Sequence, residues 1–189
     1  MTEKLYKAVR PNGRDFHTDS VQWAPEKTKA RKGRLVKHPT AAEVGGNASA
    51  YLSVSVDPTD LPGASWPMRL LVVEPVGEVV APEPERMQNK RAAVAFRVVE
   101  EIDPSARFGP QGREVAALID RAGRLTATEA RSLDAAWSAS WDAAWYAAWA
   151  LVVRDLIGSH GFTQQHYDTL SGPWRKAVGP IHADDEALS

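Results

Sequence analysis

MRLLVVEPVGEVV, residues 68–80, is a long aliphatic run that proline and glycine interrupt once. Continuous apolar runs are typical of strands in the interior of a sheet, so the run predicts a central strand that is broken or bulged at Pro75–Gly77. RAAVAFRVVEEI, residues 91–102, has the same character and predicts a second central strand. The connection between them, residues 81–90, holds two prolines, and we expect it at the surface.

Two shorter segments upstream also predict strands. YLSVSVD, residues 51–57, alternates apolar and polar side chains, which is the pattern of a half-buried strand whose buried side carries Leu52, Val54 and Val56. LYKAVR is followed by Pro11-Asn12-Gly13, and Asn-Gly is a hairpin signal because both residues tolerate a positive φ. We therefore expect a strand near Leu5–Val9 that turns back at this point.

Positive charge is concentrated near the N-terminus, although the net charge is only −1. Residues 1–40 carry ten Lys or Arg against four Asp or Glu, and six of the ten lie in EKTKARKGRLVK: Lys27, Lys29, Arg31, Lys32, Arg34 and Lys37. The segment predicts an exposed loop that leads into a short strand. We expect its charges to be solvated. The alternative is that they bind the phosphates of a nucleic acid with an affinity that falls steeply with salt.

The second half of the chain is helical in character. REVAALIDRAG has apolar residues at helical spacing and predicts a helix that stops at Gly123. Thr126 and Glu129 have the spacing of a capping box, which predicts the start of a helix that runs to Gly158, about 30 residues and about 45 Å long. A short last helix is expected from Thr163 to Leu170.

AAWSASWDAAWYAAWA, residues 135–150, places four tryptophans four residues apart: Trp137, Trp141, Trp145 and Trp149. On a helix they form one sloping stripe that winds across roughly 120° of the surface. We expect this stripe to be buried against the sheet or a neighbouring helix. The alternative is a surface for self-association or for a protein partner. Base stacking is disfavoured, because aspartates rather than lysines accompany the tryptophans.

Composition and motifs exclude several classes of protein. The chain has no cysteine, which excludes disulfides, thiolate nucleophiles and Cys-ligated metals. The five histidines show no metal-ligand spacing, and there is no P-loop, dinucleotide fingerprint or nucleophile elbow. The start of the chain lacks the apolar core of a signal peptide. The longest apolar run is shorter than the roughly 20 residues that a helix needs to cross a bilayer. We therefore expect a cytoplasmic protein with no membrane partner.

Several phrases of the sequence resemble a known group of proteins. LYKAVRPNGRDFHTDSVQW, YLSVSVDP, SWPMRLLVVEPVG, the NKRA and FRVVEEID phrases and the Ala/Trp helix together resemble a family of small uncharacterised proteins encoded by actinobacterial tailed phages and prophages. The resemblance implies an accessory phage protein that works in the bacterial cytoplasm. It assigns a role to no individual residue.

The first half of the chain is also similar, more faintly, to ADP-ribosyltransferases. The likeness implies that Lys7 or Arg10 holds the phosphates of NAD, that Ser53 and Ser55 supply the Ser-x-Ser strand, and that Glu100 or Glu101 polarises the ribose hydroxyl. Because neighbouring side chains on a strand point to opposite faces, at most one of the two glutamates can share a face with the serines. We expect the other to be a solvated strand end, and we expect the set not to converge.

The sequence therefore predicts an α+β fold in one compact domain. Residues 1–108 form a small, mainly antiparallel sheet; residues 109–182 form a long Trp/Ala-rich helix and shorter helices packed against it; residues 183–189 are a frayed tail. The predicted function is non-enzymatic: the protein binds a host or phage macromolecule through protein–protein interaction, with self-association open and with no cofactor or metal. The alternatives are an NAD-dependent ADP-ribosyltransferase and a nucleic-acid-binding regulator that uses the basic segment, residues 27–37.

Overall fold

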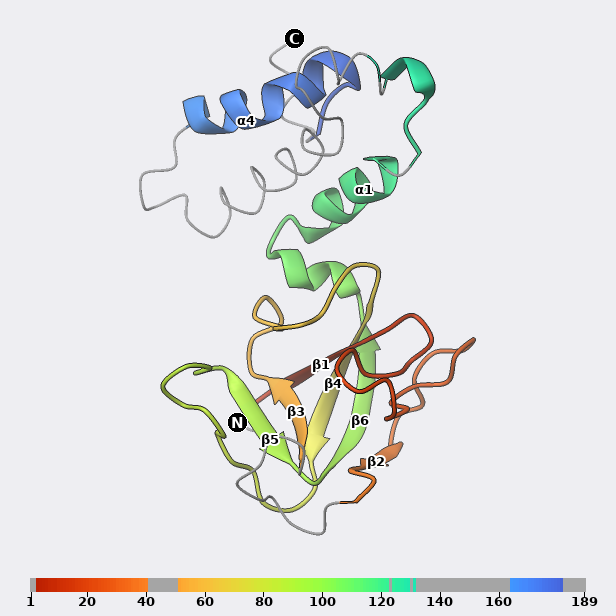
Figure 1. Cartoon of the computed structure of the whole chain (residues 1–189), viewed down its shortest axis with the longest axis vertical. Coiled ribbons are helices and arrows are strands. Elements are labelled where there is room, and N and C mark those ends of the chain that lie inside the picture. The colour runs from red at the N-terminus through yellow and green to blue at the C-terminus, as the bar shows by residue number, and fades with distance from the viewer. Residues whose placement is uncertain (1–2, 41–50, 123, 130, 132–163, 182–189) are drawn as a thin grey trace. The chain divides into compact units, whose positions relative to one another are not determined.

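The computed structural model describes residues 3–40, 51–122, 124–129, 131 and 164–181 of the chain. It shows an α+β protein, as predicted, with an antiparallel sheet followed by helices (Figure 1). The chain divides into two compact units, Met1–Arg107 and Phe108–Ser189. The sheet belongs to the N-terminal unit, and its strands are β1 (Leu5–Val9), β2 (Leu35–Lys37), β3 (Leu52–Ser55), β4 (Arg69–Pro75), β5 (Lys90–Ala93) and β6 (Ala95–Ile102).

The strand order and the short connection between β5 and β6 show that the sheet is curled. The order is β2-β6-β4-β1-β3-β5, and every pairing is antiparallel. β5 and β6 lie far apart in this order, yet only Val94 separates them in the chain, and Figure 1 shows them diverging from one corner. The predicted strand at residues 91–102 is therefore bent into two. Its second part and β4 are interior strands as predicted, whereas β5 is an end strand.

The concave face of the sheet carries the main core. Alternate residues of the strands point into it, which confirms the predicted period of two in β3, where Leu52 and Val54 are buried. Trp23 closes this core and lies against Phe96, with ring centroids 5.9 Å apart. The remaining buried members include Leu5, Val9, Val36, Leu71, Val73 and Val98.

The opposite face of the sheet is covered as well, and this explains the unbroken apolar run in β4. Leu70 packs there with Ala8, Leu61 and Met68. The short helix η2 (Pro104–Phe108) adds Ala106 to the same cluster. Because both faces of β4 are buried, an alternating pattern would have placed polar side chains in a core.

The Asn-Gly signal marks a real turn. The chain reverses after β1. The returning segment forms no regular second strand and pairs with β1 through an antiparallel bridge between Val9 and Asp15. Gly13 has a φ of +81°, and a Cβ at this position would lie 2.0 Å from the carbonyl oxygen of Ala24. Only glycine meets both requirements. The amide of Trp23 donates to the Gly13 carbonyl at 2.9 Å, so this close approach helps to place Trp23 in the core.

Two helices are described in the C-terminal unit, α1 (Gly112–Ala122) and α4 (Gln164–Ala177). α1 ends at the predicted position. The predicted end of the last helix at Leu170 is wrong, because α4 continues through Pro173 to Ala177. A proline inside a helix costs about 3 kcal/mol. Trp174 follows this proline and is buried in a cluster with residues of both helices, Val115, Leu118 and Tyr167. Burial of about 200 Å² of tryptophan surface contributes about 5 kcal/mol, which exceeds the cost of the proline.

The predicted capping box is also present. The Thr126 amide donates to a Glu129 carboxylate oxygen at 2.8 Å, and the Glu129 amide donates to the Thr126 hydroxyl at 3.2 Å. These two bonds satisfy backbone donors that a helix start leaves unpaired. The rest of the predicted long helix, with Trp137, Trp141, Trp145 and Trp149, lies outside the described residues, as does the tail.

Candidate nucleic-acid interface

The basic loop, residues 25–34, runs past the end of β6 and the start of β4 and then enters β2 (Figure 1). Its location at the surface and the short strand that follows it were both predicted. The side chains of Lys27, Lys29, Arg31 and Lys32 are exposed. The position of the loop brings these cations to one edge of the sheet, where two partners from distant parts of the sequence hold its backbone.

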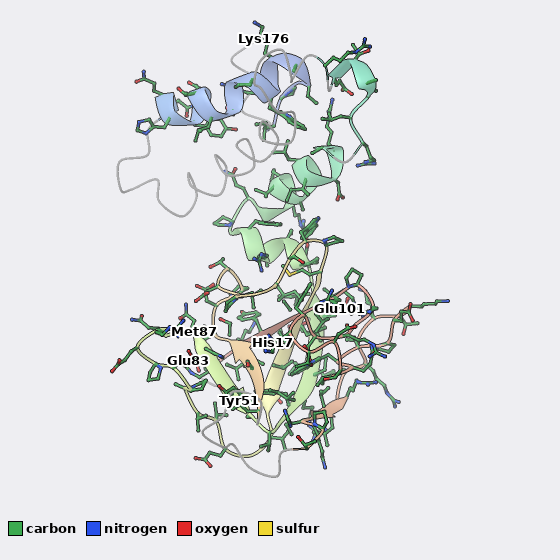
Figure 2. The ribbon with its side chains drawn as sticks, viewed as in Figure 1. His17, Tyr51, Glu83, Met87, Glu101 and Lys176 are labelled. Atoms are coloured by element: carbon green, nitrogen blue, oxygen red, sulfur yellow. The ribbon has the colours of Figure 1, made fainter. Side chains whose placement is uncertain are left out.

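The first half of the loop is held by an ion pair between Arg69 and Glu101, which we call the clip. The two side chains are only 14% and 17% exposed. Arg69 donates to both carboxylate oxygens, at 2.9 and 2.7 Å, and also to the carbonyl oxygens of Pro25 and Thr28, at 2.6 and 2.8 Å. The Ala30 amide donates to Glu101 at 2.7 Å. The clip thus fixes three backbone positions, and Figure 2 shows its Glu101 beside the N-terminal loops.

The second half of the loop is held by β6. The Gly33 amide donates to the Val98 carbonyl at 2.8 Å, and the Val98 amide donates to the Arg34 carbonyl at 2.9 Å. Gly33 has a φ of +83°, which allows the tight turn before β2. The Arg34 guanidinium donates to the Gln22 carbonyl at 3.0 Å. Arg34 is therefore half-buried and structural, unlike the other basic residues of residues 27–37, which are exposed.

The electrostatics of the loop leave a surplus of positive charge. Hydrogen bonds from Arg69 hold the pKa of Glu101 below its ordinary value, with the Ala30 amide and Lys29 acting in the same direction and burial opposing them. Glu101 therefore stays ionised, and its charge is matched by Arg69. Among the described residues, no carboxylate forms an ion pair with Lys27, Arg31 or Lys32.

The basic surface continues from the loop onto the sheet. Lys37 of β2 and Arg97 of β6 are exposed, and Arg97 lies directly opposite Leu35 in the register. Leu35 itself is 42% exposed. Sequence reasoning missed Arg97. The period of two in β6 places it at an outward position, but only the pairing with β2 brings it to the basic loop.

The register separates Lys7 from the two serines of the transferase likeness. Lys7 lies between Leu5 and Val9 on the concave face, whereas Ser53 and Ser55 alternate with the buried Leu52 and Val54 and point to the other face. The Lys7 ammonium donates to the backbone carbonyl of Ser53, at 3.1 Å. The Ser55 hydroxyl accepts the amide of Asp57 at 3.1 Å. The Arg10 guanidinium donates to the Phe16 carbonyl and not to the serine strand.

The two glutamates point to different faces, as predicted. Ser55 is opposite Tyr6, Tyr6 is opposite Val72, and Val72 is opposite Glu100. Glu100 therefore shares a face with the serines, but three strand spacings, roughly 14 Å, separate it from Ser55. Our expectation that the other glutamate is a solvated strand end is wrong, because Glu101 forms the clip.

Comparison with known proteins assigns no function. No family model, curated protein or solved structure matches this chain. Within the described ranges, no group of three or more His, Asp or Glu is placed to hold a metal ion. Over the same residues, every helix is too short or too polar to cross a membrane. A functional assignment therefore depends on the geometry of the basic loop.

Proposed function

We propose that the protein is a non-enzymatic DNA-binding protein that contacts the phosphate backbone of a duplex with its basic loop. The observation that carries the proposal is that a loop with four exposed cations is fixed to the sheet at both of its halves. Contacts to phosphates supply most of the affinity of non-specific binding and position a protein on the duplex. A loop that is ordered before binding makes such contacts at a lower entropic cost.

The charge of the surface agrees with a polyanionic ligand. Lys27, Lys29, Arg31 and Lys32 are close in the chain, and Glu26 is the one acidic residue within the loop. Lys37 and Arg97 extend the positive surface along β2 and β6. A cluster of this kind attracts phosphates over the Debye length, which is about 10 Å at moderate salt.

The surface favours a duplex over a single strand. Proteins that bind single strands stack bases on exposed aromatic side chains. Among the described residues of the N-terminal unit, every Phe, Tyr and Trp is buried or half-buried. The loop therefore offers cations without a stacking platform, and we expect binding that tolerates different sequences. An accessory phage protein, which the resemblance implies, would work among phage and host DNA.

Fluorescence anisotropy with an end-labelled duplex tests the proposal. We expect wild-type binding at about 50 mM salt that weakens by about two orders of magnitude at about 200 mM, as four phosphate contacts require. Replacing Lys27, Lys29, Arg31 and Lys32 together with Ser should abolish most of the binding and reduce the slope of log affinity against log salt by about 3 to 4.

A matched control separates a specific surface from general charge. Replacing Lys4, Arg86, Arg131 and Lys176 with Ser removes the same number of exposed positive charges from other places. The control variant should keep affinity within a few-fold of the wild type. The proposal is wrong if the wild type binds no duplex at low salt, or if both quadruple variants lose affinity equally.

A further inference from the structure

We infer that Arg69 and Glu101 are positioning residues of the DNA interface, which order the basic loop so that its cations face the phosphates together. The inference rests on the proposed function and concerns two side chains that we expect to make no contact with DNA. Both are largely buried, and their charges cancel. Their contribution to binding would therefore be missed by any search for exposed basic residues.

The contacts of the clip alternate with the cations of the loop. The Arg69 guanidinium donates to the carbonyl oxygens of Pro25 and Thr28, while the Glu101 carboxylate accepts the amide of Ala30. Lys27 and Lys29 lie between these fixed positions, and their side chains are exposed. Each backbone position that the clip fixes is one that the duplex does not have to order on binding.

The geometry of the guanidinium suits this role. Its planar fork makes four hydrogen bonds to three acceptor groups, the Glu101 carboxylate and two backbone carbonyls. A lysine carries the same charge but cannot hold a carboxylate with two parallel bonds while reaching two carbonyls on its other side. Arg69→Lys therefore keeps the net charge of the protein and weakens the hold on the loop.

Charge and positioning make opposite predictions for Glu101→Gln. The substitution removes a negative charge close to Lys29, so electrostatics alone predicts tighter binding to DNA. Loss of the charge-assisted bonds to Arg69 and to the Ala30 amide loosens the loop, so positioning predicts weaker binding. The sign of the change in affinity decides between the two.

The test compares Glu101→Gln with Glu100→Gln by anisotropy on the same duplex. Glu100 is exposed and makes no contact with the loop in the described part of the chain, so its variant has the same change in charge without the loss of the clip. We expect Glu101→Gln to weaken binding by about fivefold or more, and Glu100→Gln to bind as tightly as the wild type or more tightly. The salt slope should stay unchanged in both, because every phosphate contact is retained.

Equal or tighter binding by Glu101→Gln, when the wild type binds, overturns the inference and leaves the proposed function standing. A wild type that binds no duplex overturns the proposed function itself. If Glu101→Gln does not fold, Arg69→Lys takes its place, and unchanged affinity in that variant contradicts the inference. Hydrogen exchange in the free wild type is a further test: the Ala30 amide must exchange more slowly than those of Lys29 and Arg31, and equal rates contradict the clip.

Discussion

Replacing Lys7 with Met should change how stability depends on pH. Lys7 is half-buried on the concave face of the sheet, and its ammonium lies 5.1 Å from the centroid of the Trp23 ring. Burial lowers the pKa of Lys7 from 10.5 to about 8, while Asp15 acts in the opposite direction. The fold therefore holds a cation in an environment that disfavours its charge.

The shift in pKa gives the magnitude. The pKa of Lys7 falls from 10.5 in the unfolded chain to about 8 in the folded protein. The folded state therefore disfavours the ammonium by about 3 kcal/mol. At pH 7 this cost is fully present. Met at this position removes the cost but loses the hydrogen bond to the Ser53 carbonyl and the contact with the Trp23 ring, about 1 kcal/mol each. We expect Lys7→Met to be more stable than the wild type by about 1 kcal/mol at pH 7.

The sign of the pH dependence follows from proton binding. Between pH 8 and 10.5 the unfolded chain keeps a proton that folded Lys7 releases, so wild-type stability rises with pH over this interval. The advantage of Lys7→Met should therefore shrink by about 3 kcal/mol and change sign before pH 10.5. Urea unfolding of both proteins, followed by circular dichroism, measures this difference. A difference that stays constant from pH 7 to 10.5 would refute the reasoning.

Further substitutions test the turn at Gly13, the cap at Thr126 and the tryptophan stripe, and all are measured by denaturant unfolding. Gly13→Ala should destabilise by more than about 2 kcal/mol, because it combines a positive φ with a clash on the Ala24 carbonyl; a cost near zero would contradict the close approach. Thr126→Ala should cost about 1 kcal/mol through loss of the cap, and an unchanged midpoint would argue against it. Single Trp→Ala changes within residues 137–149 should each cost about 3–5 kcal/mol if the stripe is buried, whereas four near-wild-type midpoints would favour a binding surface.

Local patterns in the sequence predicted those parts of the fold that depend on neighbours in the chain. The alternation at Leu52 and Val54, the turn at Gly13 and the capping box at Thr126 each follow from a single stretch of seven residues or fewer. The exposed basic loop was predicted in the same way. These features need no knowledge of which strand lies beside which.

The clip could not be predicted, because it depends on register. β4 and β6 pair with a shift between Val72 and Val73: Val73 is opposite Val98, and Val72 is opposite Glu100. The extra residue in β6 reverses the faces of the residues that follow it, so Glu101 joins the face of Arg69. Nothing in FRVVEE indicates a bulge. The bend at Val94 could not be predicted for a similar reason. It depends on which strands pair with each half of residues 91–102, and the sequence does not show that.

A titration of isotope-labelled protein with a short unlabelled duplex, followed by amide chemical shifts in NMR spectra, tests DNA binding by the basic loop most directly. We predict that the largest shift changes lie at residues 26–33 and at Arg97, that they saturate with one binding curve, and that they diminish as salt is raised. Changes that are absent at low salt, or that concentrate in α1 and α4 while the loop stays unshifted, would contradict it.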